Sequence, residues 1–145
     1  MDFFSQIFSN KVLGISIFAC FLAQFIKIFT GKDKRIEISR LFTSGGMPSS
    51  HSSFVTSLST LVGIERGFQS TDFAIVCVFS LIIMYDATGV RRSVGKQAAI
   101  LNQIIDDVQH RKPIKHERLK ELVGHTPKEV LFGAILGILV ALYFV

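Results

Sequence analysis

Four runs of mostly apolar residues alternate with polar segments along the chain. They are Val12–Phe29, Ser52–Ile64, Phe73–Met84 and Val130–Val145. The last three are shorter than the roughly 20 residues that cross a bilayer comfortably. We therefore expect polar flanking residues to extend these helices, so that their polar ends lie at headgroup depth.

The segment Gly95–Val123 has a different pattern, in which apolar residues recur at helical spacing between polar ones. These apolar residues are Ala98, Leu101, Ile104, Ile105 and Val108. This spacing predicts an amphipathic helix that lies on the membrane or packs over neighbouring polar residues. A second short helix is expected after Pro113 and before Gly124, a residue type that often ends helices.

The pattern as a whole predicts an all-α integral membrane helical bundle. It would hold about four apolar helices and one or two amphipathic interfacial helices, in a single domain over residues 1–145. Composition agrees, because 49% of the residues are hydrophobic and 14 are Phe. Cys20 and Cys77 lie inside apolar runs and are expected to be buried free thiols.

Basic residues gather in the segment after the first apolar run and in the long segment after the third, whereas the connection Glu65–Asp72 is nearly neutral. The positive-inside rule then predicts a multi-pass protein of the cell membrane with both basic segments in the cytoplasm and both termini outside. The net charge of +5 suits anionic lipid or a phosphate ligand. We expect no nucleic-acid partner.

Three polar clusters stand at the ends of the apolar runs, at residues 45–52, 85–92 and 124–129. The predicted topology puts all three on the cytoplasmic side of the membrane. We therefore expect them to form one polar site at the membrane surface.

In the first cluster, Pro48 suits the first turn of a helix. Ser49 or Ser50 can cap that helix or contact phosphate, and the backbone donors of a helix N-terminus favour an anion. A desolvated histidine near a bilayer is costly without a role, so we expect His51 to be functional. Further hydroxyls down this helix are expected to serve close packing: Ser53, Thr56, Ser57 and Thr60.

In the last cluster, Thr126-Pro127-Lys128-Glu129 has the pattern of a capping box. That pattern leaves His125 unexplained. A histidine beside a helix N-terminus can attack phosphorus if a carboxylate holds its other ring nitrogen. Glu129 could supply that carboxylate, although capping and orienting would compete for it.

In the middle cluster, Asp86, Arg91 and Arg92 are expected at the end of the third helix. Asp86 should be partly buried and paired with one of the two arginines. An arginine fork is a common holder of phosphate oxygens, and we favour Arg91 for that role. Lys27, near the end of the first apolar run, can snorkel or join the site, and snorkelling is the more common behaviour.

Gly133 and Gly137 form a small-xxx-small pair in the last apolar run. Such a pair marks close helix packing, either within the fold or across a homodimer. The pattern alone leaves both open.

These clusters resemble a known superfamily. Pro48-Ser49-Ser50-His51 is similar to the Pro-Ser-Gly-His motif of type-2 phosphatidic acid phosphatases and vanadium-dependent haloperoxidases, and His125–Val130 is similar to their third motif. The strings GGMPSSHS, MYDATGVRR, GKQAAILNQ and ELVGHTPKEV resemble the divergent bacterial and plastid branch of that superfamily. The resemblance covers roughly Leu22–Gly137.

The resemblance implies roles for three residues. His125 would be the nucleophile that attacks phosphorus, and His51 the acid that protonates the leaving group. Glu129, in place of the family's Asp, would orient His125.

The chain also departs from the superfamily's pattern. Its Lys-x6-Arg-Pro motif is absent, because Lys27 and Arg35 are one residue too far apart and no proline follows. Leu119 stands where the third motif has Arg, with Arg118 one step away, and Ser50 replaces Gly.

We therefore expect a phosphatase that acts on a lipid-linked phosphate or pyrophosphate through a phosphohistidine, with no metal or other cofactor. The expected partners are a phosphorylated lipid or another phosphate ester and the membrane, and a homodimer is left open. Asp86 and Thr126 would support the site, and five residues would bind phosphate: Arg91, Arg92, Ser49, Ser50 and Lys27. Two alternatives remain open, a lipid-phosphate binding or transport protein without catalysis, and a structural membrane protein.

Overall fold

A computed structural model describes residues 2–30, 46–109 and 124–145. These residues form helices and connecting turns, with no strand among them. The helices are α1 (Phe3–Phe8), α2 (Lys11–Lys27), α3 (Ser50–Arg66), α4 (Thr71–Thr88), α5 (Val90–Gln109) and α6 (Pro127–Phe144). The all-α class is confirmed, and α1 is a helix that the sequence pattern did not predict.

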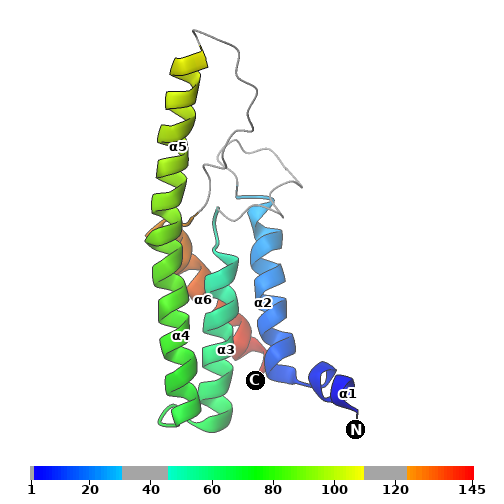
Figure 1. The fold of residues 1–145 in the computed structure, drawn as a ribbon. Helices are drawn as coiled ribbons and strands as arrows, with labels where there is room; N and C mark the ends of the chain where they lie inside the picture. Colours follow the sequence, from blue (N-terminus) through cyan, green and yellow to red (C-terminus); the bar gives the residue numbers. More distant parts are fainter. Residues whose placement is uncertain (1, 31–45, 110–123) are drawn as a thin grey trace.

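Helix α3 is the centre of the bundle. Helices α2, α4 and α6 all pack against it, whereas α4 and α6 make few contacts with each other. Figure 1 shows α1 turned away from the bundle at the end opposite to α5. The four apolar runs thus correspond to α2, α3, α4 and α6, and polar flanks extend α3, α4 and α6 beyond their runs as expected.

Helix α5 follows α4 almost end to end, so that the two form one long rod in Figure 1. Gly89 alone separates them, and its N–H donates to the Tyr85 carbonyl at 2.9 Å. The expectation that Arg91 and Arg92 end the third apolar helix is therefore wrong, since both lie in the first turn of α5. The amphipathic helix exists but starts at Val90, and the short helix expected after Pro113 lies outside the described residues.

The bundle has small and polar side chains inside and large apolar side chains outside. Alanines such as Ala19, Ala23 and Ala141 are fully buried, while Phe21 is 69% exposed and Leu139 is 58% exposed. This arrangement is typical of a membrane protein, because lipid tails solvate large apolar side chains and small residues let the helices approach. The integral membrane class is confirmed.

Hydroxyl side chains hold α3 to its neighbours. Ser53 Oγ donates to the Ala19 carbonyl of α2 at 3.0 Å, and Thr56 Oγ1 lies 3.1 Å from the Ala134 carbonyl of α6. On the α4 side, Ser80 Oγ lies 2.7 Å from Ser59 Oγ. The hydroxyls of α3 thus serve helix packing, as the sequence predicts.

The two glycines of α6 also pack within the fold. A Cβ on Gly133 would collide with the backbone of Ser49, and one on Gly137 with the Ser53 carbonyl. Of the two explanations that the sequence left open, the structure supports packing inside one chain. The small-xxx-small pair therefore gives no argument for a homodimer.

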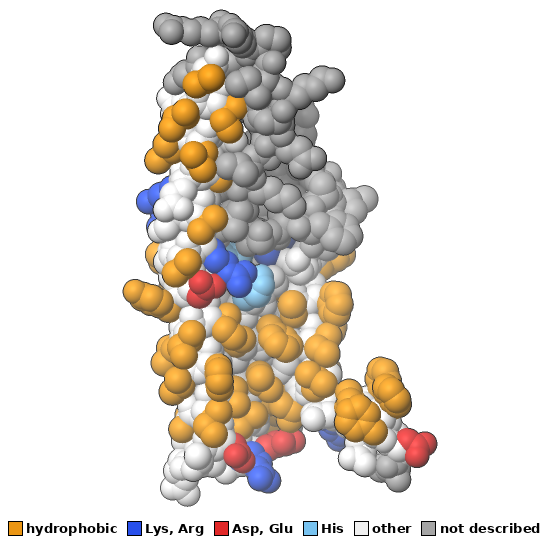
Figure 2. All heavy atoms as spheres, viewed as in Figure 1, with side chains coloured by type: hydrophobic (Ala, Val, Ile, Leu, Met, Phe, Trp, Pro, Cys, Tyr) orange, Lys and Arg blue, Asp and Glu red, His pale blue; other side chains and the backbone are white. Residues whose placement is uncertain are grey.

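Two helical segments are long and apolar enough by themselves to cross a membrane, namely the α4–α5 rod from Thr71 to Asp106 and α6. In Figure 2 the apolar surface of the bundle lies between two groups of charged side chains, and further apolar side chains lie on α5 beyond one of these groups. On α4 this band runs from Asp72 to Asp86, about 21 Å at 1.5 Å per residue. That height is below the ~30 Å of a bilayer core, so polar groups at the band's ends lie at or just below headgroup depth.

Candidate functional site

Backbone contacts bring the three polar clusters to one end of the bundle. The Ser49 N–H donates to the Glu129 carbonyl at 2.9 Å, which joins the start of α3 to the start of α6. The His125 N–H donates to the Ala87 carbonyl at 2.9 Å, which joins the start of α6 to the end of α4. Residues far apart in the sequence thus surround one small volume.

His125 is the most enclosed ionisable group among the described residues of this site. Its side chain is 1% exposed, and its Nδ1 lies 3.2 Å from Oε2 of Glu129. Its Nε2 is buried and has no hydrogen-bond partner among the described residues. If Nδ1 carries the proton and donates to Glu129, Nε2 presents an unshared electron pair to the site.

The environment of His125 favours this neutral form. Burial and then the ammonium of Lys27 lower the pKa of His125 below its ordinary 6.5, against the hydrogen bond to Glu129, which raises it. Because a lowered pKa leaves the imidazole unprotonated at neutral pH, its Nε2 can act as a nucleophile or a base there.

Glu129 holds His125 and caps α6 with the same oxygen. Its Oε2 accepts the Thr126 N–H at 3.0 Å while it faces Nδ1 of His125, and its own N–H donates to Thr126 Oγ1 at 3.3 Å. The predicted capping box is confirmed. The expected competition between capping and orienting is wrong, because a carboxylate oxygen can accept two hydrogen bonds.

His51 faces His125 from the first turn of α3. The two ring centroids are 6.2 Å apart with an angle of 62° between the ring planes. Unlike His125, the His51 side chain is exposed. One small ligand could therefore contact both rings.

Ser49 and Ser50 take different positions at the start of α3. Ser49 is the N-cap, and its Oγ accepts the Ser52 N–H at 3.3 Å. Ser50 Oγ accepts a hydrogen bond from Lys27 Nζ at 3.3 Å. Pro48 precedes the cap, so its expected place in the first helical turn is wrong.

Lys27 is 3% exposed, although it ends a helix at the membrane boundary. The snorkelling that the sequence favoured is therefore wrong, and the alternative that Lys27 joins the site holds. A buried ammonium costs several kcal/mol without a partner. Its hydrogen bond to Ser50 and its attraction to Glu129 partly offset that cost, and an anionic ligand would offset more.

Arg91 and Asp86 form an ion pair at the rim of the site, with Arg91 Nε 2.6 Å from Asp86 Oδ2. The expected pairing and partial burial of Asp86 are confirmed. Both side chains are partly exposed, at 47% for Arg91 and 37% for Asp86, so the pair can exchange for a ligand. Arg92 is exposed and makes no ion pair with any other residue in the described ranges.

Three helix N-termini meet around the histidines. The chain at Gly124 passes so close to α5 that a Cβ would stand 2.6 Å from Cα of Arg92. The starts of α3 and α6 are joined through Ser49 and Glu129. First-turn N–H groups lack intrahelical acceptors and carry the positive end of the helix dipole, so this end of the bundle suits an anion.

Sequence reasoning missed two features of this site. The Ala87 carbonyl that anchors His125 belongs to a residue with no chemical signal of its own. Gly124 was read as a helix terminator, whereas it permits the close approach to Arg92.

Within the described residues no three His, Cys, Asp or Glu side chains gather as metal ligands would, and the cofactor-free expectation stays a prediction. Arg35, Arg118 and Leu119 lie outside the described residues.

Similarity to known proteins extends over nearly the whole chain. An uncharacterized membrane protein of Bacillus subtilis, YuiD, is 41% identical over 150 residues, which covers 94% of this chain and 95% of that protein. No solved structure matches the chain. The sequence profile of the Divergent PAP2 family matches residues 8–140, and the chain therefore belongs to that family.

Proposed function

We propose that the protein is a phosphatase that hydrolyses a lipid-linked phosphate or pyrophosphate at the cytoplasmic face of the cell membrane. The observation that carries this proposal is the buried Nε2 of His125. It has no partner among the described residues, while Nδ1 of the same ring faces a carboxylate. A buried polar atom without a partner is costly, and a phosphoryl group would supply what it lacks.

In the proposed reaction, Nε2 of His125 forms a bond to phosphorus as the P–O bond to the leaving group breaks. His51 gives its proton to the leaving oxygen. Water, deprotonated by His51, then attacks the phosphohistidine, which releases inorganic phosphate and restores His125. Glu129 stabilises the positive charge that His125 acquires during attack.

Charge stabilisation is the largest part of catalysis in phosphoryl transfer. Lys27 and the N-terminal N–H groups of α3, α5 and α6 would carry much of it. Arg91 would leave Asp86 and bind the phosphoryl oxygens. Ser49 and Ser50 contribute less directly, because one caps α3 and the other holds Lys27 in place.

The cytoplasmic orientation is part of the proposal. In the sequence the basic residues follow α2 and α4, the helices whose ends carry Lys27 and Ala87 of the site, and the positive-inside rule favours that end in the cytoplasm. Four crossings by α2, α3, α4 and α6 would leave both termini outside. Accessibility of an engineered cysteine at Lys128 to a membrane-impermeant reagent, in whole cells against inverted vesicles, tests this orientation.

The direct test is phosphate release by the purified protein in nanodiscs. Substrates would be a polyprenyl phosphate, a polyprenyl pyrophosphate and a diacylglycerol phosphate. Release by wild type that His125→Ala abolishes and Lys128→Ala retains supports the proposal. Lys128 is a matched control, since it is exposed and lies three residues away. Equal release by wild type and His125→Ala would refute it.

A second candidate is a protein that binds or carries lipid phosphates without hydrolysing them. The ion pair of Arg91 with Asp86 favours it. While Arg91 is paired with Asp86, Lys27 is the one cation, among the described residues, that is hydrogen-bonded inside the cluster. Less positive charge is then available to stabilise phosphoryl transfer. This alternative predicts saturable binding of lipid phosphate, weakened by Arg91→Ala, with no phosphate released.

A further inference from the structure

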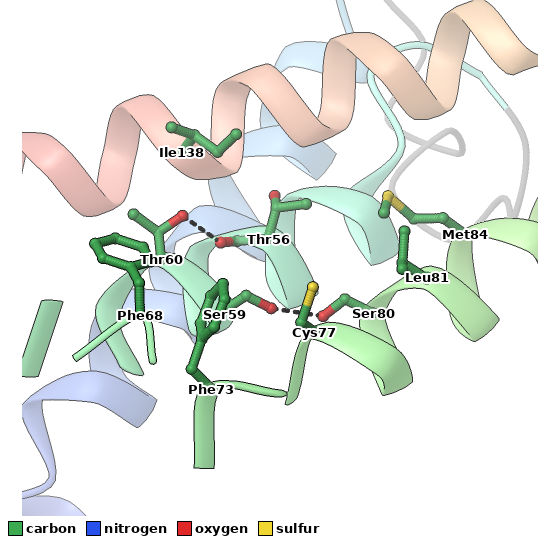
Figure 3. Close-up of a pocket in the computed structure, with 10 residues that line it drawn as sticks. All are labelled: Thr56, Ser59, Thr60, Phe68, Phe73, Cys77, Ser80, Leu81, Met84 and Ile138. Atoms are coloured by element: carbon green, nitrogen blue, oxygen red, sulfur yellow. Dashed lines mark hydrogen bonds between the residues drawn. The ribbon is translucent and has the colours of Figure 1, made fainter. Parts of the chain in front are cut away.

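An open groove lies between α4 and α6, with α3 as its floor. It has a volume of about 190 Å³, and Figure 3 shows Thr56 and Ser59 of α3, Cys77 and Leu81 of α4, and Ile138 of α6 along its walls. The groove exists because α4 and α6 both pack on α3 but barely touch each other.

The surface of this groove is apolar although hydroxyls line it. Thr56 Oγ1 donates to the Ser52 carbonyl at 2.7 Å, and Thr60 Oγ1 donates to the Thr56 carbonyl at 2.8 Å. Ser80 Oγ lies 3.1 Å from the Val55 carbonyl and donates to it. With their hydroxyls bonded to backbone, these side chains leave few polar atoms for a ligand, so the groove suits a hydrocarbon.

One end of the groove, at Met84, lies one helical turn of α4 from the histidine site. Met84 lines the groove and lies one helical turn before Ala87, the residue whose carbonyl accepts the His125 N–H. The other end reaches the α3–α4 turn, where the rings of Phe68 and Phe73 meet edge to face with centroids 5.1 Å apart. From Phe73 to Met84 the groove follows α4 for roughly 16 Å.

We propose that this groove binds one hydrocarbon chain of an amphiphilic phosphate whose phosphate group lies at His125. This inference rests on the proposed function and names the form of its substrate. A volume near 190 Å³ is below the ~300–1,000 Å³ of sites for drug-sized ligands, so it suits one narrow chain. A second chain of the same lipid would stay in the bilayer.

The groove also explains how a lipid reaches a buried nucleophile. Its open side faces the surface where lipid tails lie, and Leu81 at its rim is 57% exposed. A chain can therefore enter sideways from the membrane. The bound hydrocarbon chain then fixes the distance between the phosphate and His125. A soluble phosphate ester has no such chain to hold it in place.

The experiment is photo-crosslinking with a dodecylphosphonate, whose C–P bond is not hydrolysed, in phosphatidylcholine nanodiscs. One probe carries a diazirine beside the phosphonate and the other carries it at the chain terminus. Peptide mapping should find the first probe around Met84 and the second around Phe68 and Phe73. Cys77→Trp, which fills the groove, should cut both labels at least fivefold.

Val78→Trp is the matched control, because Val78 is the next residue of α4, is 55% exposed and does not line the groove. It should leave labelling within twofold of wild type. If Cys77→Trp fails to fold, protection of the Cys77 thiol in a Cys20→Ala background gives a second measurement. Dodecylphosphonate should slow its reaction with a membrane-soluble maleimide at least fivefold.

Labelling spread evenly over lipid-facing residues of α2 and α4, or unchanged in Cys77→Trp, would overturn the groove. So would labels concentrated on a second copy of the chain. The readout is independent of turnover. If the two probes label the expected ends of the groove but the protein releases no phosphate, the groove proposal stands and the proposed catalysis is refuted. If the protein releases phosphate but the probes do not label those ends, catalysis stands and the groove proposal is refuted.

Discussion

The starts of α3 and α6 are built alike, yet they treat their histidines differently. A hydroxyl residue caps each helix, Ser49 in α3 and Thr126 in α6. His51 lies just after its cap and is exposed, whereas His125 lies just before its cap and is 1% exposed. Among the described residues, a carboxylate contacts the ring of His125 and none is hydrogen-bonded to the ring of His51. The histidine before the cap is thus buried and hydrogen-bonded, whereas the histidine after the cap is exposed.

This contrast matches the division of labour in the proposed reaction. A nucleophile needs a fixed direction of attack and a ring that is neutral at the working pH. A proton donor needs exchange with solvent between its two proton transfers. The buried ring held by Glu129 meets the first need, and the exposed ring meets the second.

Replacing the held ring should have the largest effect. His125→Ala removes the nucleophile, and we expect phosphate release to fall by about 10³-fold or more. Lys128→Ala should retain wild-type activity. Rates measured on lipid phosphates in nanodiscs check this, and a loss below tenfold would mean that His125 is not the nucleophile.

Replacing the exposed ring should slow formation of the phosphohistidine only for poor leaving groups. General acid catalysis contributes about 10²–10⁴-fold, so in His51→Ala the transfer of phosphate from an alkyl phosphate to His125 should slow by at least 100-fold. Transfer from a nitrophenyl phosphate needs no acid and should lose less than about fivefold. Hydrolysis of the phosphohistidine, in which His51 acts as base, should slow equally for both esters, so the transfer rates are measured in a single turnover. Equal losses of transfer rate on both esters would contradict the assignment of His51 as acid.

Glu129→Gln separates the two tasks of one side chain. Gln can still accept the Thr126 N–H in a capping box, so the melting temperature should stay within a few degrees of wild type. The charge that stabilises the His125 imidazolium is lost, and activity should fall about 10–100-fold. Thr126→Ala is the reverse control, with about 1 kcal/mol lost from the helix cap and most activity kept. Loss of folding in Glu129→Gln would show that the cap dominates.

The pH dependence should give the smallest effect. His125 must be neutral to attack, and its pKa is lowered from 6.5 by burial and by Lys27. With a nitrophenyl phosphate, which needs no proton from His51, phosphorylation of the protein should therefore stay constant as pH falls to 6.5 and decline only below it. Glu129→Gln removes a contribution that raises the pKa of His125, so the decline should move to still lower pH. A shift to higher pH would contradict this electrostatic account.

Local features of the site followed from the sequence. The capping box at Thr126 and Glu129, the cap at Ser49 and the pairing of Asp86 with an arginine each depend on residues close together in the chain. The convergence of the clusters was also expected, because hydropathy and loop charge put them on one side of the membrane.

Features that depend on tertiary contacts did not follow from the sequence. The burial of Lys27 depends on α3, whose Ser50 lies 3.3 Å from its ammonium. The spacing of Gly133 and Gly137 predicts close helix packing. It does not identify the helix that packs against them, which is α3 in the structure. The groove depends on α4 and α6 diverging over α3, which has no sequence signal of its own.

The most direct test of the account is a search for phosphate bound to His125 during turnover. The protein would be mixed with a radiolabelled lipid phosphate, quenched in alkali within milliseconds and digested for peptide mapping. We predict a label that is stable to alkali and lost in acid, on the peptide that contains His125, and absent from His125→Ala. Phosphate release at the wild-type rate with no label on that peptide would contradict the account.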